Sequence, residues 1–143
     1  MSKKKGTRRQ GKVDRKVQYQ DVVALQIACS EGRDILTAGQ YEHVKDLLKQ
    51  LVGFGSQSYD KMIHVEPIGD FWEFKEKGGV LGKINLRVYF AHIKSKNEVV
   101  LLHSYKKEDD GKIGPHMQIR LRNRTRQYLA GELKVEVTYT RRD

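Results

Sequence analysis

The sequence predicts an α+β protein in which helices pack on a single antiparallel sheet. Three observations lead to this class. Apolar residues recur at helical spacing in residues 37–53, and the spacing then changes to that of strands in four short segments between residues 63 and 105. Brief turns join these segments, which is typical of an antiparallel meander. Residues 115–131 return to helical spacing, and helices on either side of a run of strands indicate the α+β class.

Residues 1–16 predict a flexible basic arm that precedes one domain, residues 17–143. The arm carries eight Lys or Arg against Asp14, a net charge of +7, and its only apolar residues are Met1 and Val13. So little apolar surface cannot offset the entropy cost of ordering the chain. A solubilising tail and a nucleic-acid contact are both compatible with this composition.

Two segments follow the arm: one whose secondary structure is ambiguous, and one that is clearly a helix. Residues 19–28 suit either a short helix or a strand, and periodicity does not decide between them. Thr37-Ala38-Gly39-Gln40 then forms a capping box, in which the Thr37 and Gln40 side chains satisfy free N–H groups at a helix start. The helix is expected to end at Gly53 and Gly55. Its apolar stripe comprises Tyr41, Val44, Leu47, Leu48 and Leu51.

Four strands are expected next, and together they form a sheet of about four strands. The first contains Ile63 and Val65, and the others span Asp70–Glu76, Lys83–Ile93 and Glu98–Tyr105. Gly78-Gly79 and Ser95-Lys96-Asn97 are turn signals between them. In the third strand, alternation places Ile84, Leu86, Val88 and Phe90 on one face and Asn85, Arg87, Tyr89 and Ala91 on the other.

The C-terminal part predicts a loop, a helix and a last strand. Lys106–Gly114 is a charged loop, Pro115 suits the first position of a helix, and Gly131 suits its end. Residues 117–122 also alternate as a strand would, but the Pro115 start and the Gly131 stop favour the helix. Residues 133–140 alternate apolar and polar side chains, which indicates a strand.

Composition narrows the function classes. The chain has 143 residues, 28 Lys or Arg and 18 Asp or Glu, for a net charge of +10, and this excess favours a polyanion as partner. Residues 17–111 carry a net charge of −2 and residues 112–143 a net charge of +5. The single cysteine, Cys29, excludes an internal disulfide and a cysteine-based zinc site. Histidine spacing and glycine patterns suggest neither a metal nor a cofactor, and the absence of a long apolar run predicts a soluble cytoplasmic protein.

The order of the motifs resembles a known family. Over residues 35–130 the chain is similar to the RelE/ParE toxin superfamily, and more closely to its HigB-like, phage-derived branch. The basic arm and the strand after Gly131 are not part of that pattern. The motifs that carry the resemblance are Phe71-Trp72-Glu73-Phe74-Lys75, Leu86-Arg87-Val88-Tyr89-Phe90, Val99-Val100-Leu101-Leu102-His103-Ser104-Tyr105-Lys106-Lys107, and a Pro-started helix that ends in Tyr128-Leu129.

The resemblance implies a fold, an activity and partners. The fold has two N-terminal helices, a twisted antiparallel sheet and a C-terminal helix. The activity is either cleavage of mRNA in the ribosomal decoding site or poisoning of DNA gyrase, and a cognate antitoxin protein usually holds such toxins inactive. Neither metal nor cofactor is implied.

Metal-free RNA cleavage needs a base for the 2′-hydroxyl, cations for the phosphate and an acid for the leaving 5′ oxygen. Arg87 matches the family's phosphate-binding arginine; otherwise it is an exposed strand arginine. Lys106 and Lys107 match a basic strand end, or else form a solvated turn, and Lys75 matches a basic residue that ends its strand. Glu73 departs from members that carry paired lysines in this strand, although the HigB-like branch commonly has Glu there.

Histidines and arginines complete the candidates. His116 begins the C-terminal helix, where the family often places a catalytic or phosphate-binding side chain, although an exposed histidine is the plainer reading. His103 alternates with Leu101 and Val99, so we expect it to face inward and to serve packing. Four cations without an intervening acid favour an RNA or antitoxin surface on this helix: Arg120, Arg122, Arg124 and Arg126.

The leading hypothesis is a ribosome-dependent, metal-independent mRNA endoribonuclease of a toxin–antitoxin system. Arg87, Lys107 and His116 are its expected catalytic residues, and Lys75, Lys106, Arg120 and Arg124 its expected RNA contacts. Its partners are mRNA, the ribosome and an antitoxin, without a membrane. Two alternatives stay open: a gyrase-poisoning toxin, and a non-catalytic phage or ribosome-associated protein that binds nucleic acid.

Overall fold

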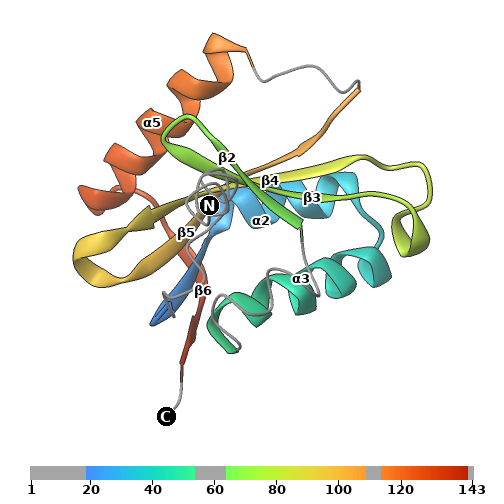
Figure 1. Cartoon of the computed structure of the whole chain (residues 1–143), viewed down its shortest axis with the longest axis horizontal. Helices are drawn as coiled ribbons and strands as arrows, with labels where there is room; N and C mark the ends of the chain where they lie inside the picture. The colour runs from blue at the N-terminus through green and yellow to red at the C-terminus, as the bar shows by residue number, and fades with distance from the viewer. Residues whose placement is uncertain (1–18, 54–63, 109–113, 142–143) are drawn as a thin grey trace, which may run out of the picture.

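The computed structural model describes residues 19–53, 64–108 and 114–141, and it confirms the α+β class (Figure 1). The predicted basic arm, Gly55 and Ile63 lie outside the described residues. The described elements are β1 (Asp21–Leu25), α2 (Gln26–Ile35), α3 (Ala38–Gly53), β2 (His64–Ile68), β3 (Phe71–Glu76), the 3-10 turn η1 (Gly79–Leu81), β4 (Leu86–Ile93), the 3-10 turn η2 (Lys94–Lys96), β5 (Glu98–Lys106), α5 (Pro115–Leu129) and β6 (Val135–Thr140).

One sheet of six described strands holds the fold together, in the order β2-β3-β4-β5-β1-β6. The predicted meander is confirmed, because β2, β3, β4 and β5 pair antiparallel to one another in sequence order. The predicted last strand is β6, which pairs antiparallel with β1. β1 itself lies parallel to β5, with Val22 opposite Val99, and so extends the meander beyond four strands.

The ambiguous segment at residues 19–28 contains the end of a strand and the start of a helix. β1 ends at Leu25 and α2 begins at Gln26. Val22, Val23, Ala24 and Leu25 are all buried, because β1 lies inside the sheet with helices over both faces. A strand buried on both faces has no alternation of apolar and polar residues, which is why periodicity could not identify it.

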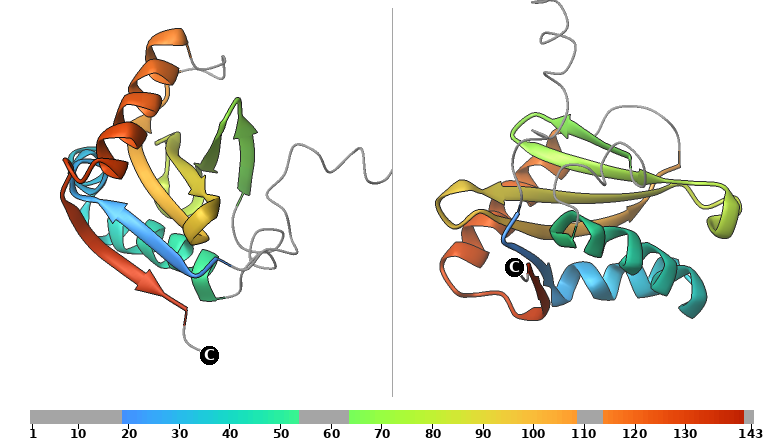
Figure 2. Two further views of the ribbon diagram at one scale, coloured as in Figure 1. Left: turned by 90° about the vertical axis from the view of Figure 1, so that its left-hand side faces the viewer. Right: turned by 60° about the horizontal axis from the view of Figure 1, so that its bottom comes forward.

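Helices cover the two faces of the sheet. Figure 1 shows α5 on one side of the strands and α3 on the other, and Figure 2 shows the same layers from two further directions. The α3 face is packed by Val44, Leu48 and Leu51 of α3 against Val88 and Phe90 of β4. The α5 face is packed by residues that include Leu121 of α5 and Tyr89, Val100 and Leu102 of the sheet.

The predicted helix boundaries at Thr37, Pro115 and Gly131 are confirmed. The Gln40 N–H donates to Thr37 Oγ1 at 3.2 Å, and the Thr37 N–H donates to Gln40 Oε1 at 2.9 Å, which completes the capping box. Pro115 occupies the first turn of α5. After α5 ends, Gly131 adopts φ 76°, a left-handed conformation that favours glycine at a helix end.

Candidate functional site

Two rows of side chains cross the α5 face of the sheet, from β3 through β4 to β5. Strand pairing sets both rows: Lys75 is opposite Arg87, which is opposite Tyr105, and one step along the strands Glu73 is opposite Tyr89, which is opposite His103. We call these six residues the polar array. It comprises Glu73, Lys75, Arg87, Tyr89, His103 and Tyr105.

Arg87 is the centre of the first row, and it is not the exposed strand arginine of the plainer interpretation. It is 5% exposed, and its Nε lies 3.5 Å from Oε2 of Glu73, which is 2% exposed. Arg87 Nη1 also donates to the carbonyl oxygen of Leu86 at 3.3 Å and to the side-chain oxygen of Asn85. A buried carboxylate therefore balances the guanidinium charge and fixes the position of Arg87.

Lys75 is the accessible cation of the array. Its Nζ lies 3.9 Å from Glu73 Oε1, and about a third of its side chain is exposed (32%). Tyr89 lies in the neighbouring row and is fully buried. Burial, and then the nearby Glu73 carboxylate, raise the pKa of Tyr89. The array thus presents a neutral phenol between a buried ion pair and a histidine.

His103 is buried between two aromatic rings. Its ring centroid lies 6.2 Å from that of Tyr89 and 6.0 Å from that of Tyr105, and in both pairs the rings are stacked. His103 is 4% exposed. Its Nε2 is buried and has no hydrogen-bond partner among the described residues. One ring nitrogen is thus left without a partner in the interior of the array.

The other ring nitrogen has two neighbours. His103 Nδ1 lies 2.9 Å from Glu31 Oε1 of α2 and 2.9 Å from Arg124 Nη1 of α5. With a proton on Nδ1 the histidine donates to Glu31, and without one it accepts from Arg124. In the neutral ring with its proton on Nδ1, Nε2 carries a free lone pair, and the carboxylate holds the ring in place.

A β-bulge explains why His103 belongs to this face. Tyr89 is opposite His103, and the next residue, Phe90, is opposite Leu101, so Leu102 is an extra residue in β5. The extra residue turns His103 to the α5 face, although Leu101 packs on the α3 face. The prediction that His103 faces inward is confirmed. Simple alternation, however, would have placed it on the same face as Leu101.

Glu31 joins three parts of the fold. It accepts from Arg124 Nη1 at 2.9 Å and Nη2 at 2.8 Å, and from the Ser104 N–H at 3.1 Å. Burial alone would raise the pKa of Glu31, but hydrogen bonds with His103 and Arg124 outweigh it and lower the pKa to about 2. Glu31 is therefore ionised at neutral pH.

The structure separates the seven residues expected from sequence into two groups. Lys75 and Arg87 are neighbours in the array, and the Lys107 N–H donates to the Asn85 carbonyl oxygen at 2.8 Å, which places the Lys107 backbone opposite Asn85, just after the end of β5. Lys106 is exposed opposite Leu86. On α5, His116 and Arg120 are exposed, whereas Arg124 turns inward and also donates to the Leu102 carbonyl oxygen at 2.8 Å.

Sequence reasoning missed Glu31 and the two tyrosines of the array. Tyr89 and Tyr105 occupy strand positions that carry the predicted motifs, so their alternation with Val88 and Ser104 was the available signal. Glu31 lies in a segment without a motif, and only the fold brings it to His103.

Among the described residues, no group of three or more His, Cys, Asp or Glu side chains could hold a metal ion. None of the described helices is long and apolar enough to cross a membrane.

Comparison with known proteins gives no match: no family model, no curated protein and no solved structure is significantly similar to the chain. The polar array and its surroundings bring together the buried Arg87, two phenols and a carboxylate-held histidine. Groups of these kinds can transfer protons and stabilise the charge of a phosphate without a metal ion.

Proposed function

We propose that this chain is a toxin that cleaves mRNA on the ribosome without a metal ion, and that a cognate antitoxin protein holds it inactive. The observation that carries the proposal is the geometry of His103. Glu31 Oε1 lies 2.9 Å from its Nδ1, and its Nε2 has no partner among the described residues, which is the arrangement of an oriented general base. Arg87 and Lys75 lie on the same sheet face, where they supply positive charge for a phosphate.

The order of the elements supports the same proposal. Two helices, α2 and α3, precede the antiparallel meander of β2 to β5, and α5 follows it. The resemblance to the RelE/ParE superfamily implies these elements in this order. β1 pairs with the free edge of β5, the last strand of the meander, and β6 then pairs with β1.

The proposed reaction assigns a role to each group. His103 Nε2 accepts the proton of an RNA 2′-hydroxyl, the 2′ oxygen bonds to phosphorus, and the bond from phosphorus to the 5′ oxygen breaks. Lys107, which follows β5 and donates its backbone N–H to Asn85, is the candidate that protonates the leaving oxygen, and His116 on α5 is the alternative. RNA reaches Nε2 when the half-buried Tyr105 leaves its stack on the imidazole.

The outer face of α5 supplies the attraction for a polyanion. α5 contains no acidic residue, and Arg120, Arg122 and Arg126 are exposed along it. Exposed arginines contact phosphates and release counterions, so binding weakens steeply as salt rises. The inward turn of Arg124 removes this residue from the RNA-facing set and assigns it to holding Glu31 and His103.

A second candidate function is a non-catalytic protein that binds RNA. It is favoured by the pairing of cations in and beside the polar array, since Arg87 is balanced by Glu73 and Arg124 by Glu31. In this case the exposed cations of α5 and Lys106 make all the contacts with RNA. The two functions differ in what the array contributes, because a binder needs it for folding alone.

Induced expression in bacteria tests the proposal. The wild-type chain is expected to arrest growth and to fragment messages within minutes. Arg87→Lys and His103→Gln keep polar side chains of similar size and are expected to abolish both effects while the protein still accumulates as a folded species. His92→Gln is the matched control, because His92 lies on the same strand as Arg87 but contacts Tyr19 of the α3 face. Unchanged growth and intact messages with the folded wild-type chain would overturn the proposal.

A further inference from the structure

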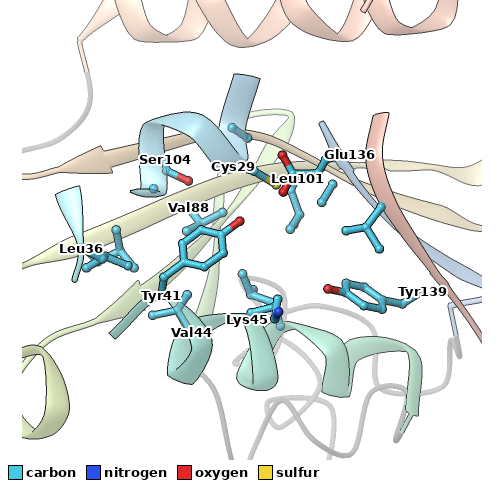
Figure 3. Close-up of a pocket in the computed structure, with 16 residues that line it drawn as sticks. Cys29, Leu36, Tyr41, Val44, Lys45, Val88, Leu101, Ser104, Glu136 and Tyr139 are labelled. Atoms are coloured by element: carbon cyan, nitrogen blue, oxygen red, sulfur yellow. The ribbon is translucent and has the colours of Figure 1, made fainter. Parts of the chain in front are cut away.

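The α3 face of the sheet contains a pocket that the proposed function does not use. Its volume is about 340 Å³, which is within the range of small-molecule sites. Figure 3 shows Val88 and Leu101 of the sheet above Tyr41 and Val44 of α3, with Tyr139 of β6 to their right. The polar array lies on the opposite face of the same sheet, so the two sites are separate.

The pocket exists because one of its walls carries small residues. Ala24, Ala28 and Gly32 line it from the end of β1 and along α2. A Cβ on Gly32 would lie 3.3 Å from Tyr41 Cε1 and 3.6 Å from Ser104 Oγ, so Tyr41 packs directly against the glycine. Larger side chains at these three positions would occupy the pocket.

The charges that line the pocket are already balanced. Glu136 accepts from both terminal nitrogens of Arg33, at 2.7 and 2.8 Å. Lys45 Nζ lies 2.8 Å from Glu42 Oε1. A charged ligand would therefore bring an uncompensated charge into a mainly apolar space, which costs free energy.

Two hydroxyl groups remain to orient a ligand. Figure 3 shows the hydroxyls of Tyr41 and Tyr139 directed toward the interior of the pocket from two different sides. Tyr41 Oη accepts from Arg33 Nη1 at 3.2 Å and also interacts with the Cys29 thiol, a weak hydrogen-bonding group that a ligand oxygen can replace. Burial raises the pKa of both tyrosines, so both hydroxyls are neutral donors.

We propose that this pocket binds an uncharged, mainly apolar small molecule that carries one hydrogen-bonding group. The apolar part contacts Val88, Leu101 and Val137, and the polar group bonds to a tyrosine hydroxyl. An alkylphenol has this chemistry and a suitable length. The proposal is independent of RNA cleavage, because no residue of the polar array lines the pocket.

Cys29 provides a built-in reporter for the test, because it lines the pocket and is the single cysteine of the chain. The full chain is titrated with 4-pentylphenol, with 4-pentylbenzoate as the charged analogue. Binding is followed by methyl chemical shifts and by the rate at which N-methylmaleimide alkylates Cys29. We expect saturable shifts at Ala24, Val88 and Leu101, alkylation slowed at least tenfold at saturation, and affinity for the benzoate at least tenfold weaker.

Three variants, one of them a control, make the result specific. Val137→Trp fills the pocket from β6 and is expected to weaken binding of the phenol at least tenfold, whereas Thr138→Trp on the same strand, outside the pocket, leaves binding within twofold. Tyr41→Phe keeps the ring and is expected to weaken binding about fivefold, the effect of one neutral hydrogen bond. The proposal is overturned by saturable binding that Val137→Trp leaves unchanged in a folded protein, by equal affinity for the benzoate, or by no shift at the pocket methyl groups.

Discussion

Glu31 Oε1 lies 2.9 Å from His103 Nδ1, and this contact joins α2 to the bulged end of β5. The same carboxylate accepts from the Ser104 N–H. β1 pairs with β5 only as far as Leu101, so the side chain of α2 satisfies a backbone donor that lies beyond the paired part of β5. The position of His103 and the end of the pairing between β1 and β5 thus depend on one residue.

The first prediction concerns acid stability. The pKa of Glu31 is lowered from 4.5 to about 2 in the folded protein, so its carboxylate stabilises the fold above pH 4.5 and that contribution is lost as the pH falls toward 2. The contribution is about 2 kcal/mol after allowance for partial solvent screening. Urea unfolding of wild type and Glu31→Gln at pH 7, 4 and 2.5 measures it. The difference in free energy of unfolding is expected to shrink toward pH 2.5, and a constant difference would contradict the assignment.

The second prediction separates two arginines of α5. Arg124→Ala leaves Glu31 partly buried without its bidentate partner and is expected to cost about 3 kcal/mol of stability. Arg120→Ala removes an exposed side chain and is expected to change stability by less than about 0.5 kcal/mol. Urea denaturation at pH 7 compares the two. Equal costs would show that Arg124 is not held inward.

The third prediction concerns RNA binding and uses the same exposed arginine. Arg120→Ala is expected to weaken binding to all RNA sequences alike and to reduce the slope of log K against log salt by about 1. Titrations of a fluorescent RNA at several salt concentrations measure the slope. An unchanged slope would remove Arg120 from the RNA contact surface.

The fourth prediction tests the buried ion pair of the array, Glu73 with Arg87. Glu73→Leu or Arg87→Met alone leaves one buried charge unbalanced and is expected to cost about 3 kcal/mol. The double variant leaves no charge and is expected to recover most of that loss, although RNA cleavage stays abolished. A double-mutant cycle measured by urea denaturation gives the coupling energy between Glu73 and Arg87. Additive losses of unfolding free energy would mean that the two side chains are not coupled.

The elements with local signals were predicted from sequence. The capping box located the start of α3, Pro115 located that of α5, and alternation located the meander. β1 could not be identified in the same way. Its neighbours, β5 and β6, are distant in the sequence, and its residues are buried on both faces, so neither alternation nor turn chemistry marks it.

The candidate site was predicted less completely, because it depends on the register of paired strands and on which face of α5 packs on the sheet. Arg87 was identified on its strand, but its ion pair with Glu73 arises from the pairing of β3 with β4. The bulge at Leu102, invisible to alternation, brings His103 to the α5 face. Arg124 was grouped with the exposed arginines, although it lies three residues after the buried Leu121 and therefore shares its face.

Single-turnover cleavage of a reporter mRNA on purified ribosomes tests the central claim most directly. The wild-type chain is expected to cut the message in the ribosomal decoding site in the presence of a metal chelator that leaves the ribosomes intact. His103→Gln is expected to reduce the rate at least about 100-fold, the usual contribution of a general base, whereas His92→Gln reduces it less than about threefold. Cleavage by folded His103→Gln at the wild-type rate, or no cleavage by the wild-type chain, would contradict the account.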